Sequence, residues 1–324
     1  MTHGEQALVL GASGGIGSEV ARQLRDAGWR VRGMKRGAPD ARPDVHGIEW
    51  IQGDAMNRAD VTRAARGCAV IVHAVNPPGY KRWADFVLPM IDHTIAAAKA
   101  EGATIVLPGT VYNFGPDALP FIDERAPQRP LTEKGAIRVE MEARLERASK
   151  EGARVLIVRA GDFFGPKAGN NWFSQGLVTP GKPVRKISCP GARGVGHEWS
   201  YLPDVARTMI ELLRRRDTLA PFARFHMGGH WDEDGMQFAR AIQRVAARNR
   251  PRIVGFPWWL LALASPFNTT FRELREMRYL WRTPVRMNNA LLVHTLGHEP
   301  HTPLDEAVEA TLVGLGCLDL GERA

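Results

Sequence analysis

The stretch Gln6-Ala-Leu-Val-Leu10 runs directly into Gly11-Ala-Ser-Gly-Gly-Ile-Gly17, and this junction indicates the fold of the chain. A short apolar strand ends in a glycine turn, and a helix follows in which Ile16, Val20 and Leu24 recur at helical spacing. This order of elements brings backbone N–H groups and the positive end of the helix to a place where a diphosphate docks. The junction predicts a dinucleotide-binding unit; its alternative is a tight strand–helix turn without a ligand.

The glycines of the turn have separate physical tasks. Gly11 permits the tight turn, Gly14 lets a phosphate approach the backbone, and Gly17 lets the helix pack against the strand. Their spacing is G-x-x-G-x-x-G rather than G-x-G-x-x-G. The turn and the first helical residues are therefore the predicted diphosphate contacts, namely Gly11, Ser13, Gly14, Gly15 and Ile16.

Apolar strands and helical patterns alternate through the first half of the chain. This alternation predicts an α/β fold, a doubly wound parallel sheet of the Rossmann type. Beyond residue 165 the alternation gives way to loops rich in Gly, Pro and Trp. We expect a nucleotide-binding domain over 1–165 and a smaller α+β substrate lobe over 166–324, from which some elements return to the first domain. The predicted strands are 6–10, 29–34, 48–52, 69–73, 103–107 and 154–159, and the predicted helices are 16–27, 58–66, 83–101, 133–151, 204–214, 234–247, 288–296 and 304–313.

Composition narrows the class of protein. Three scattered cysteines among 324 residues form neither a disulfide framework nor a C-x-x-C pair, and the first residues do not resemble a signal peptide. These features predict a cytoplasmic protein. The longest apolar block, Phe256–Ala264, is far short of the roughly 20 residues that span a membrane. We expect a buried helix there and no membrane partner; the alternative is a surface that meets a partner or a membrane.

The net charge of +8 is compatible with anionic ligands. Arginines are spread along the chain, and the only run is Arg214-Arg215-Arg216. It follows a helical pattern, so a solvated helix end is expected there rather than a nucleic-acid patch. No RNA- or DNA-binding motif is apparent, and no nucleic-acid partner is expected.

Two cations mark the end of the second predicted strand. Lys35 and Arg36 stand where enzymes specific for NAD usually carry an acidic residue that binds the ribose hydroxyls. An acid there would repel a 2′-phosphate, whereas two cations would pair with it. The sequence therefore predicts NADP as the cofactor, with NAD as the alternative. In the structural alternative, both side chains point into solvent.

With these residues in view, the chain resembles the extended short-chain dehydrogenase/reductase family, the NAD-dependent epimerase/dehydratase group. The glycine turn is similar to that family's phosphate loop, and the match runs over most of the chain. The other similar segments are Gly53-Asp54-Ala55, Val72-His-Ala74-Val75, Val111-Tyr112, Asp123–Pro130, Arg159–Pro166, Tyr201–Ala206 and Leu296–Pro300. The resemblance implies cofactor contacts at Asp54, Ala55, Ala74, Val75 and Gly161, and a homodimer as the assembly.

The chain departs from the family at the reaction centre. The family uses Tyr-x-x-x-Lys on a helix, where the spacing puts both side chains on one face. None of the four tyrosines here is followed by Lys at that spacing. Aligning the proline segment puts Lys134 at the Tyr position and Arg138 at the Lys position, and Thr110 substitutes for the usual Ser/Thr. We expect Lys134 and Thr110 to be catalytic and Arg138 to hold the cofactor or a substrate anion; alternatively, Lys134 and Arg138 are surface cations.

The remaining candidates are polar and aromatic side chains in loops at the ligand edge of the predicted sheet. His294, His298 and His301 straddle a predicted helix end, so no metal site is expected. The favoured function is an oxidoreductase or epimerase/dehydratase-like activity on a small carbonyl or nucleotide-sugar-like molecule. The alternative is a non-catalytic NADP(H)-binding regulatory module. The predicted substrate contacts are Asn76, Tyr112, Asn113, Phe163, Asn171 and Trp172.

Overall fold

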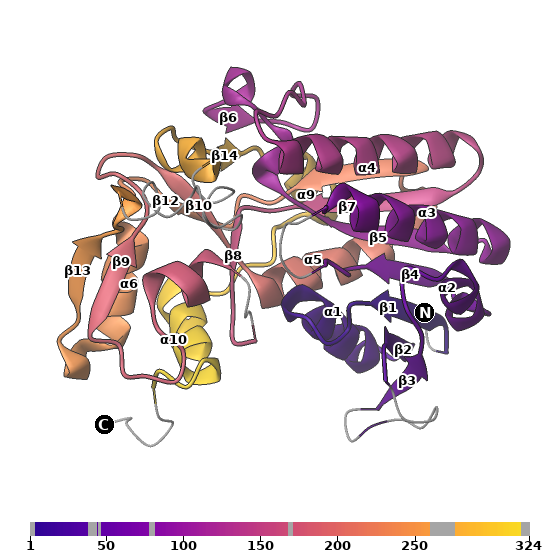
Figure 1. Cartoon of the computed structure of the whole chain (residues 1–324), viewed down its shortest axis with the longest axis horizontal. Coiled ribbons are helices and arrows are strands. Elements are labelled where there is room, and N and C mark those ends of the chain that lie inside the picture. Colours follow the sequence, from indigo (N-terminus) through magenta and orange to yellow (C-terminus); the bar gives the residue numbers. More distant parts are fainter. Residues whose placement is uncertain are drawn as a thin grey trace.

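The computed structural model describes residues 4–37, 44, 47–77, 82–167, 171–259 and 276–318. Its centre is a parallel sheet of seven strands in the order β11-β7-β5-β4-β1-β2-β3 (Figure 1). This sheet confirms the predicted α/β fold of the Rossmann type. The strands are β1 (Gln6–Leu10), β2 (Arg30–Lys35), β3 (Ile48–Gln52), β4 (Val70–His73), β5 (Thr104–Gly109), β7 (Arg154–Arg159) and β11 (Phe222–His226).

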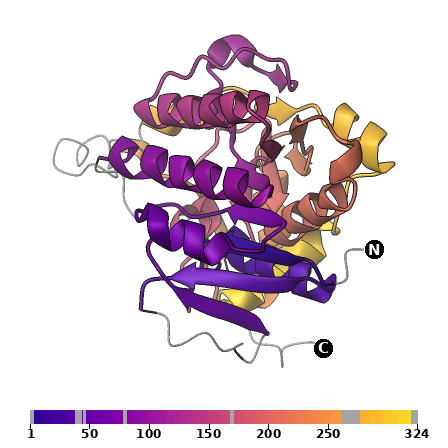
Figure 2. The same cartoon turned by 90° about the vertical axis from the view of Figure 1, so that its right-hand side faces the viewer.

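Helices cover both faces of the large sheet. On one face, α1 (Gly15–Asp26), α5 (Leu202–Leu213) and α9 (Ala290–Leu296) share a core with the strands. On the other, α2 (Arg58–Ala65), α3 (Ala84–Glu101) and α4 (Glu133–Lys150) do the same. Figure 2 shows α4, α3 and α2 stacked side by side. Burial on both faces explains why Ala7–Leu10 of β1 is a continuous apolar run rather than an alternating one.

The rest of the chain builds smaller sheets beside this layer. Their shared core is aromatic and includes Phe164, Phe173, Trp199 and Phe238. Apart from strand β11 and helices α5 and α9, most of the described segment beyond residue 165 lies here (Figure 1). Its elements are β8 (Asp162–Phe164), β10 (His197–Tyr201), β12 (His230–Asp232), β9 (Lys186–Cys189), β13 (Arg252–Gly255), α6 (Gln237–Val245) and α10 (Leu304–Gly314), while β6 (Phe121–Ile122) pairs with β14 (Arg286–Met287) near η1 (Val111–Asn113).

Some predicted boundaries are displaced by side-chain caps. The helix predicted over 234–247 begins at Gln237, because the Asp232 carboxylate accepts hydrogen bonds from the backbone N–H groups of Gln237 and Phe238. The helix predicted over 288–296 begins at Ala290, whose N–H donates to the Asn288 side chain at 2.9 Å. Local capping sets these ends.

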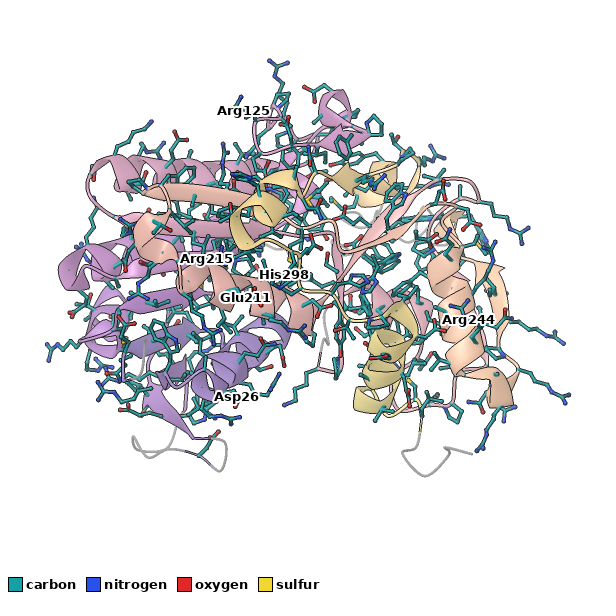
Figure 3. All side chains as sticks on the ribbon, turned by 180° about the vertical axis from the view of Figure 1, so that it is seen from behind. Asp26, Arg125, Glu211, Arg215, Arg244 and His298 are labelled. Atoms are coloured by element: carbon teal, nitrogen blue, oxygen red, sulfur yellow. The ribbon has the colours of Figure 1, made fainter. Side chains whose placement is uncertain are left out.

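In the arginine run after α5, Arg214 and Arg215 are exposed at the helix end, as expected, and Arg216 is half-buried. Arg215 donates to the carbonyls of Thr295 and Leu296 at the end of α9, and Arg216 pairs with Glu5 at 2.5 Å. Figure 3 shows Arg215 beside α9. Of the apolar block at 256–264, residues 260–264 lie outside the described residues. None of the described helices combines the length and apolar character needed to cross a membrane.

Candidate active site

A groove lies along the carboxyl ends of the central strands, where ligands bind in open parallel sheets. One part of it, of about 590 Å³, extends past the ends of β2 and β3. The other, of about 370 Å³, extends past the ends of β4 and β5. Both parts are lined by Gly11, Ser13, Val75 and Asn76, so they form one continuous site. The combined size suits a dinucleotide and a small molecule.

The glycine turn forms the floor where the two parts meet. Gly11 has φ +84°, and a Cβ there would lie 2.5 Å from the carbonyl oxygen of Ala74. A Cβ on Gly17 would lie 2.1 Å from the Gly11 carbonyl oxygen, so the helix packs directly on the strand. Gly14 precedes α1 and offers no side chain to cap its first N–H groups. These donors are therefore available to an anion.

Lys35 and Arg36 line the larger part of the groove together with Asp54 and Ala55. The Lys35 ammonium lies 4.3 Å from the centre of the Trp50 ring, which holds it at this edge. Arg36 is exposed. Asp54 accepts a hydrogen bond from the Met56 N–H at 2.9 Å, which orients its carboxylate. The two cations thus lie at the end of the groove farthest from β5, where they could meet a phosphate.

Arg138 is the charged side chain of the smaller part. It lines this part together with Thr110, Phe163 and Asn171, and its Nη2 lies 3.5 Å from the Asn76 Oδ1. Its guanidinium also lies 5.1 Å from the centre of the Trp83 ring. The Thr110 Oγ1 accepts from the Tyr112 N–H at 3.3 Å, which leaves the hydroxyl proton available to a ligand.

His73 also lines this part of the groove, at the end of β4. Its Nδ1 lies 2.8 Å from the Thr94 hydroxyl, and the side chain is buried. Burial, with a smaller contribution from the charge of Arg138, lowers the pKa of His73 to about 3. The ring is therefore neutral at pH 7 and does not supply a proton as an imidazolium.

Acidification is expected to destabilise the fold through His73. An unfolded histidine has a pKa of about 6.5, so between that value and the folded pKa of about 3 the unfolded chain binds more protons. The free energy of unfolding therefore falls as the pH drops, by about 2 kcal/mol from this group between about pH 7 and pH 5. Urea unfolding at both pH values measures the loss. His73→Asn should lack this component; a variant with unchanged pH dependence would contradict the assignment.

Lys134 lies beside the groove rather than in its lining. Its ammonium lies 4.5 Å from the centre of the Tyr112 ring and 5.7 Å from that of Trp83. Lys134 precedes Arg138 by one helical turn on α4, so both cations approach the indole of Trp83. Neither is simply a solvated surface cation.

The model of the NAD dependent epimerase/dehydratase family matches residues 7–228, which is more than half of the chain. The chain belongs to this family. Solved structures with the same fold include UDP-N-acetylglucosamine 4-epimerase from Bacillus cereus, at 14% identity over 96% of this chain and 99% of that chain, with a TM-score of 0.72. The enzyme WbmH of Bordetella bronchiseptica in complex with NAD+ has 18% identity over 96% of this chain and 98% of that chain, with a TM-score of 0.69.

Two curated relatives match shorter segments. A 2-alkyl-3-oxoalkanoate reductase of Shewanella oneidensis is 32% identical over 100 residues, which is 29% of this chain and 25% of that protein. A (4-alkanoyl-5-oxo-2,5-dihydrofuran-3-yl)methyl phosphate reductase of Streptomyces griseus is 34% identical over 119 residues, which is 36% of this chain and 39% of that protein. The chain thus spans about a quarter and about two fifths of the length of these relatives.

Most of the residues that the sequence predicted to bind the cofactor of this epimerase/dehydratase family member line the groove. Those that line it are Gly11, Ser13, Gly14, Gly15, Ile16, Lys35, Arg36, Asp54, Ala55, Ala74, Val75 and Arg138, with Thr110, Asn76, Phe163 and Asn171 from the predicted catalytic and substrate sets.

Five predicted site residues, Lys134 among them, do not line the groove within the described part of the chain. Tyr112 lies against Lys134, and Trp172 packs in the aromatic core of the second lobe. Gly161 packs against β10 and donates its N–H to the Ser200 hydroxyl at 2.9 Å. Asn113 is fully buried and donates to Glu142 at 2.9 Å.

The structure adds groove residues that the sequence did not single out. Leu202, Pro108 and His73 line the smaller part, and Met34 and Phe86 line the larger part. His73 and Pro108 lie at the ends of predicted strands, which was a usable signal. Leu202 begins a helix 90 residues beyond Tyr112 in sequence; its segment resembles the family, but no feature of the residue itself predicts a groove contact.

The three spaced histidines separate in the structure. His298 lies 3.4 Å from Glu211 of α5, whereas His301 lies against His230 with ring centres 4.4 Å apart. Figure 3 labels His298 and Glu211. No group of three or more His, Cys, Asp or Glu side chains suited to a metal ion occurs among the described residues.

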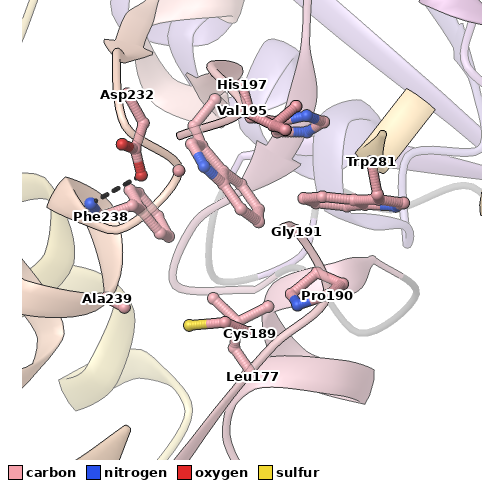
Figure 4. Close-up of a pocket in the computed structure, with 12 residues that line it drawn as sticks. Leu177, Cys189, Pro190, Gly191, Val195, His197, Asp232, Phe238, Ala239 and Trp281 are labelled. Carbon is pink, nitrogen blue, oxygen red and sulfur yellow. Dashed lines mark hydrogen bonds between the residues drawn. The ribbon is translucent and has the colours of Figure 1, made fainter. Parts of the chain in front are cut away.

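A second cavity in the smaller lobe has a volume of only about 10 Å³, room for about one water (Figure 4). His197 lines it and pairs through Nε2 with the Asp162 carboxylate at 2.8 Å. Its ring stacks on Trp281 at 3.8 Å between centres. A cavity of this size is a small gap in the packing of the aromatic core and is too small for a substrate.

Proposed function

We propose that the chain binds NADP(H) in the groove and catalyses a redox reaction on a small oxo compound there. The observation that carries this proposal is the composition of the groove. The glycine turn, the Lys35-Arg36 pair and Arg138 are far apart in sequence, yet they line one continuous cavity at the ligand edge of the sheet. Membership of an NAD-dependent family supports the same class of cofactor.

The groove fits a nicotinamide dinucleotide in three places. The uncapped N-terminus of α1 offers N–H donors to the diphosphate. Asp54 and Ala55 lie at the end expected to take the adenosine, and Lys35 and Arg36 offer cations to a 2′-phosphate. When bound, the reduced cofactor supplies a hydride to a carbonyl carbon. The residues of the chain must then bind and orient the oxo compound and supply a proton to its oxygen.

NADPH is expected to bind more tightly than NADH. Arg36→Ala should weaken NADPH binding about tenfold or more, since hydrogen bonds to charged groups contribute about 1.5–3 kcal/mol. NADH lacks the 2′-phosphate, so its affinity should not change. Calorimetry with both cofactors measures this, and Arg66→Ala, which removes an exposed arginine outside the groove, is the control. Tighter binding of NADH by the wild type would reverse the assignment.

The smaller part of the groove suits an oxo compound that carries an anionic group. Arg138 can hold a carboxylate or a phosphate through paired N–H donors. The Thr110 hydroxyl is placed to donate a hydrogen bond to an oxo oxygen, and Lys134, one turn from Arg138, is the proposed proton source. The printed names of both curated relatives describe reductases whose substrates carry such a group, an alkanoate and a phosphate.

The test is consumption of NADPH with a panel of small 3-oxo acids and their methyl esters. Arg138→Met should raise the KM for an acid about tenfold or more, because it removes a charge-assisted contact. The KM for the uncharged ester should change little, which controls for damage to the fold. An equal rise for acid and ester would contradict a role of Arg138 in holding the anion. No turnover with any member of the panel would count against this substrate class.

A non-catalytic NADP(H)-binding module is the second candidate. Among the described residues, the ionisable side chains of the smaller part are His73 and Arg138. The first is neutral at pH 7, and the guanidinium of the second stays protonated throughout. A site without a titrating acid in its lining favours binding over catalysis. Turnover by the wild type that Lys134→Met abolishes would support the enzyme, whereas NADPH binding by the wild type without turnover of any panel member would support the module.

A further inference from the structure

The small sheet of β9 and β13 gathers positive charge at one edge. The two strands are parallel, so they begin at the same edge, and Lys186 is paired in register with Arg252. The Arg252 N–H donates to the Arg185 carbonyl at 3.1 Å, which brings that arginine alongside. Arg248 and Arg250 lie just before β13. We call Arg185, Lys186, Arg248, Arg250 and Arg252 the basic edge; all five are exposed.

The alternation along the strands turns these cations outward. Ile187 and Ile253 are the next pair in register, and both pack towards the aromatic core of the lobe. Successive side chains of a strand point to opposite faces, so Lys186 and Arg252 both face away from that core. Neighbouring strands lie about 4.8 Å apart, and like charges directly opposite each other are destabilising. An anion placed over this pair would remove the repulsion.

No carboxylate among the described residues of this lobe forms an ion pair with the basic edge. Asp234 pairs with Arg240 at 2.8 Å, and Asp305 pairs with Arg244 at 2.6 Å. Within the described ranges, none of the five residues of the basic edge makes an ion pair. The sheet also lies at the margin of the molecule, at the opposite end from α2 (Figure 1). A large anionic surface can therefore approach it.

The segment that follows β13 carries apolar and aromatic side chains. The Trp258 indole donates to the Pro190 carbonyl at 2.8 Å, which fixes the chain beyond the strand. The next residue, Trp259, has 66% of its surface exposed. Tryptophan favours the boundary between lipid headgroups and acyl chains, whereas cations are attracted to anionic headgroups. Arg248, Arg250 and Arg252 lie at or just before the start of β13, and Trp259 follows its end, so the cations and the indole flank the same four-residue strand.

We propose that the basic edge, with Trp259, docks the protein on the surface of a bilayer rich in anionic phospholipid. The contact is peripheral, and the charges complement the phosphates of the headgroups. It departs from the sequence expectation of no membrane partner, because the two short basic segments come together only when β9 pairs with β13. The exposed indole favours a lipid surface over duplex DNA, whose phosphate backbone is bound by cations without an aromatic ring.

Sedimentation with vesicles tests the proposal on the full chain. The wild type should sediment with vesicles that contain phosphatidylglycerol, remain in solution with phosphatidylcholine alone, and be released by high salt. The triple variant Arg185→Gln, Lys186→Gln, Arg252→Gln should bind about a hundredfold more weakly, about fivefold for each cation removed. Trp259→Ser should weaken binding with little change in its salt dependence.

Two controls test whether a loss of vesicle binding comes from the charges of the basic edge, rather than from unfolding or from the net charge of the protein. Arg185→Lys with Arg252→Lys keeps the charges and should bind as the wild type does. Arg58→Gln, Arg66→Gln and Arg125→Gln together remove three exposed cations elsewhere and should change binding little. Unchanged melting temperature of the first triple variant excludes unfolding. The proposal is overturned if the wild type does not sediment with vesicles that contain phosphatidylglycerol, or if both triple variants lose binding equally. It is also overturned if the protein binds duplex DNA more tightly than vesicles at the same ionic strength.

Discussion

Replacing Glu142 with alanine is expected to lower the free energy of unfolding by about 3–5 kcal/mol, because it leaves a buried charge without its partner. The Arg159 guanidinium binds both oxygens of Glu142, at 2.9 and 2.7 Å. The side chains are only 1% and 5% exposed. The same carboxylate accepts hydrogen bonds from Asn113 and Gln128, so the buried Asn113 amide and the half-buried Gln128 amide also lose their acceptor. Urea denaturation measures the loss.

Glu140 on the same helix supplies the matched control. It pairs with Arg144 at 2.9 Å and with Arg147 at 3.0 Å, but its side chain is 40% exposed. Glu140→Ala should therefore cost at most about 1 kcal/mol. Joint replacement of Glu142 by Leu and Arg159 by Met should recover much of the lost stability, since neither charge then remains buried. Equal losses for the Glu140 and Glu142 variants would contradict this account.

The Glu142 variant also bears on the proposed site. Arg159 donates to the Thr110 carbonyl at 2.5 Å and to the His226 ring at 3.2 Å. It thereby joins the end of β5, helix α4 and β11 behind the groove. A guanidinium released from Glu142 would no longer hold Thr110 in place, so turnover should fall even where the variant remains folded.

Gly11→Ala is expected to weaken NADPH binding about a hundredfold, which corresponds to about 2.7 kcal/mol. The added Cβ would lie 2.5 Å from the Ala74 oxygen and 2.8 Å from the Val75 nitrogen, both of them backbone atoms. The turn must therefore move away from β4, and the donors at the start of α1 move with it. Calorimetric titration with NADPH measures the change.

Gly102→Ala isolates the cost of the backbone conformation. Gly102 has φ +67°, comparable to that of Gly11, but a Cβ there meets nothing within 4 Å. It should lower stability by about 1 kcal/mol and leave cofactor affinity unchanged. If both variants bind NADPH as the wild type does, the turn is not the diphosphate site, and the proposed function loses its main support.

The large sheet was predictable because its signals are local. A strand buried on both faces must be apolar throughout, and an amphipathic helix repeats its apolar positions every three or four residues. Each pattern is contained in a short stretch of sequence, such as Gln6–Leu10 for a strand and Gly15–Asp26 for a helix. The strand ends then place Lys35, Asp54 and Ala74 at one edge, because all seven strands are parallel. Much of the predicted cofactor set follows from this geometry.

Burial of side chains outside the regular helix and strand patterns was less predictable, because the contacts join distant segments. Asn113 has the polar, loop-borne character of a substrate contact, yet the Arg159–Glu142 pair draws it into the interior. Trp172 likewise enters an aromatic core made by Trp258 and Trp281, more than eighty residues away. Burial of a side chain depends on which surfaces meet, and no local pattern specifies that.

The sequence alone predicted the parallel sheet and the glycine turn, and it shows that no tyrosine is followed by lysine at the Tyr-x-x-x-Lys spacing. The tertiary structure decides which distant residues become neighbours. It sets Lys134 over Tyr112, brings Leu202 into the groove and joins Arg185, Lys186 and Arg252 at one edge. Periodicity and backbone chemistry act over a few residues and can be read along the chain, whereas charge clustering and cavity shape arise from pairs that meet only when distant segments pack.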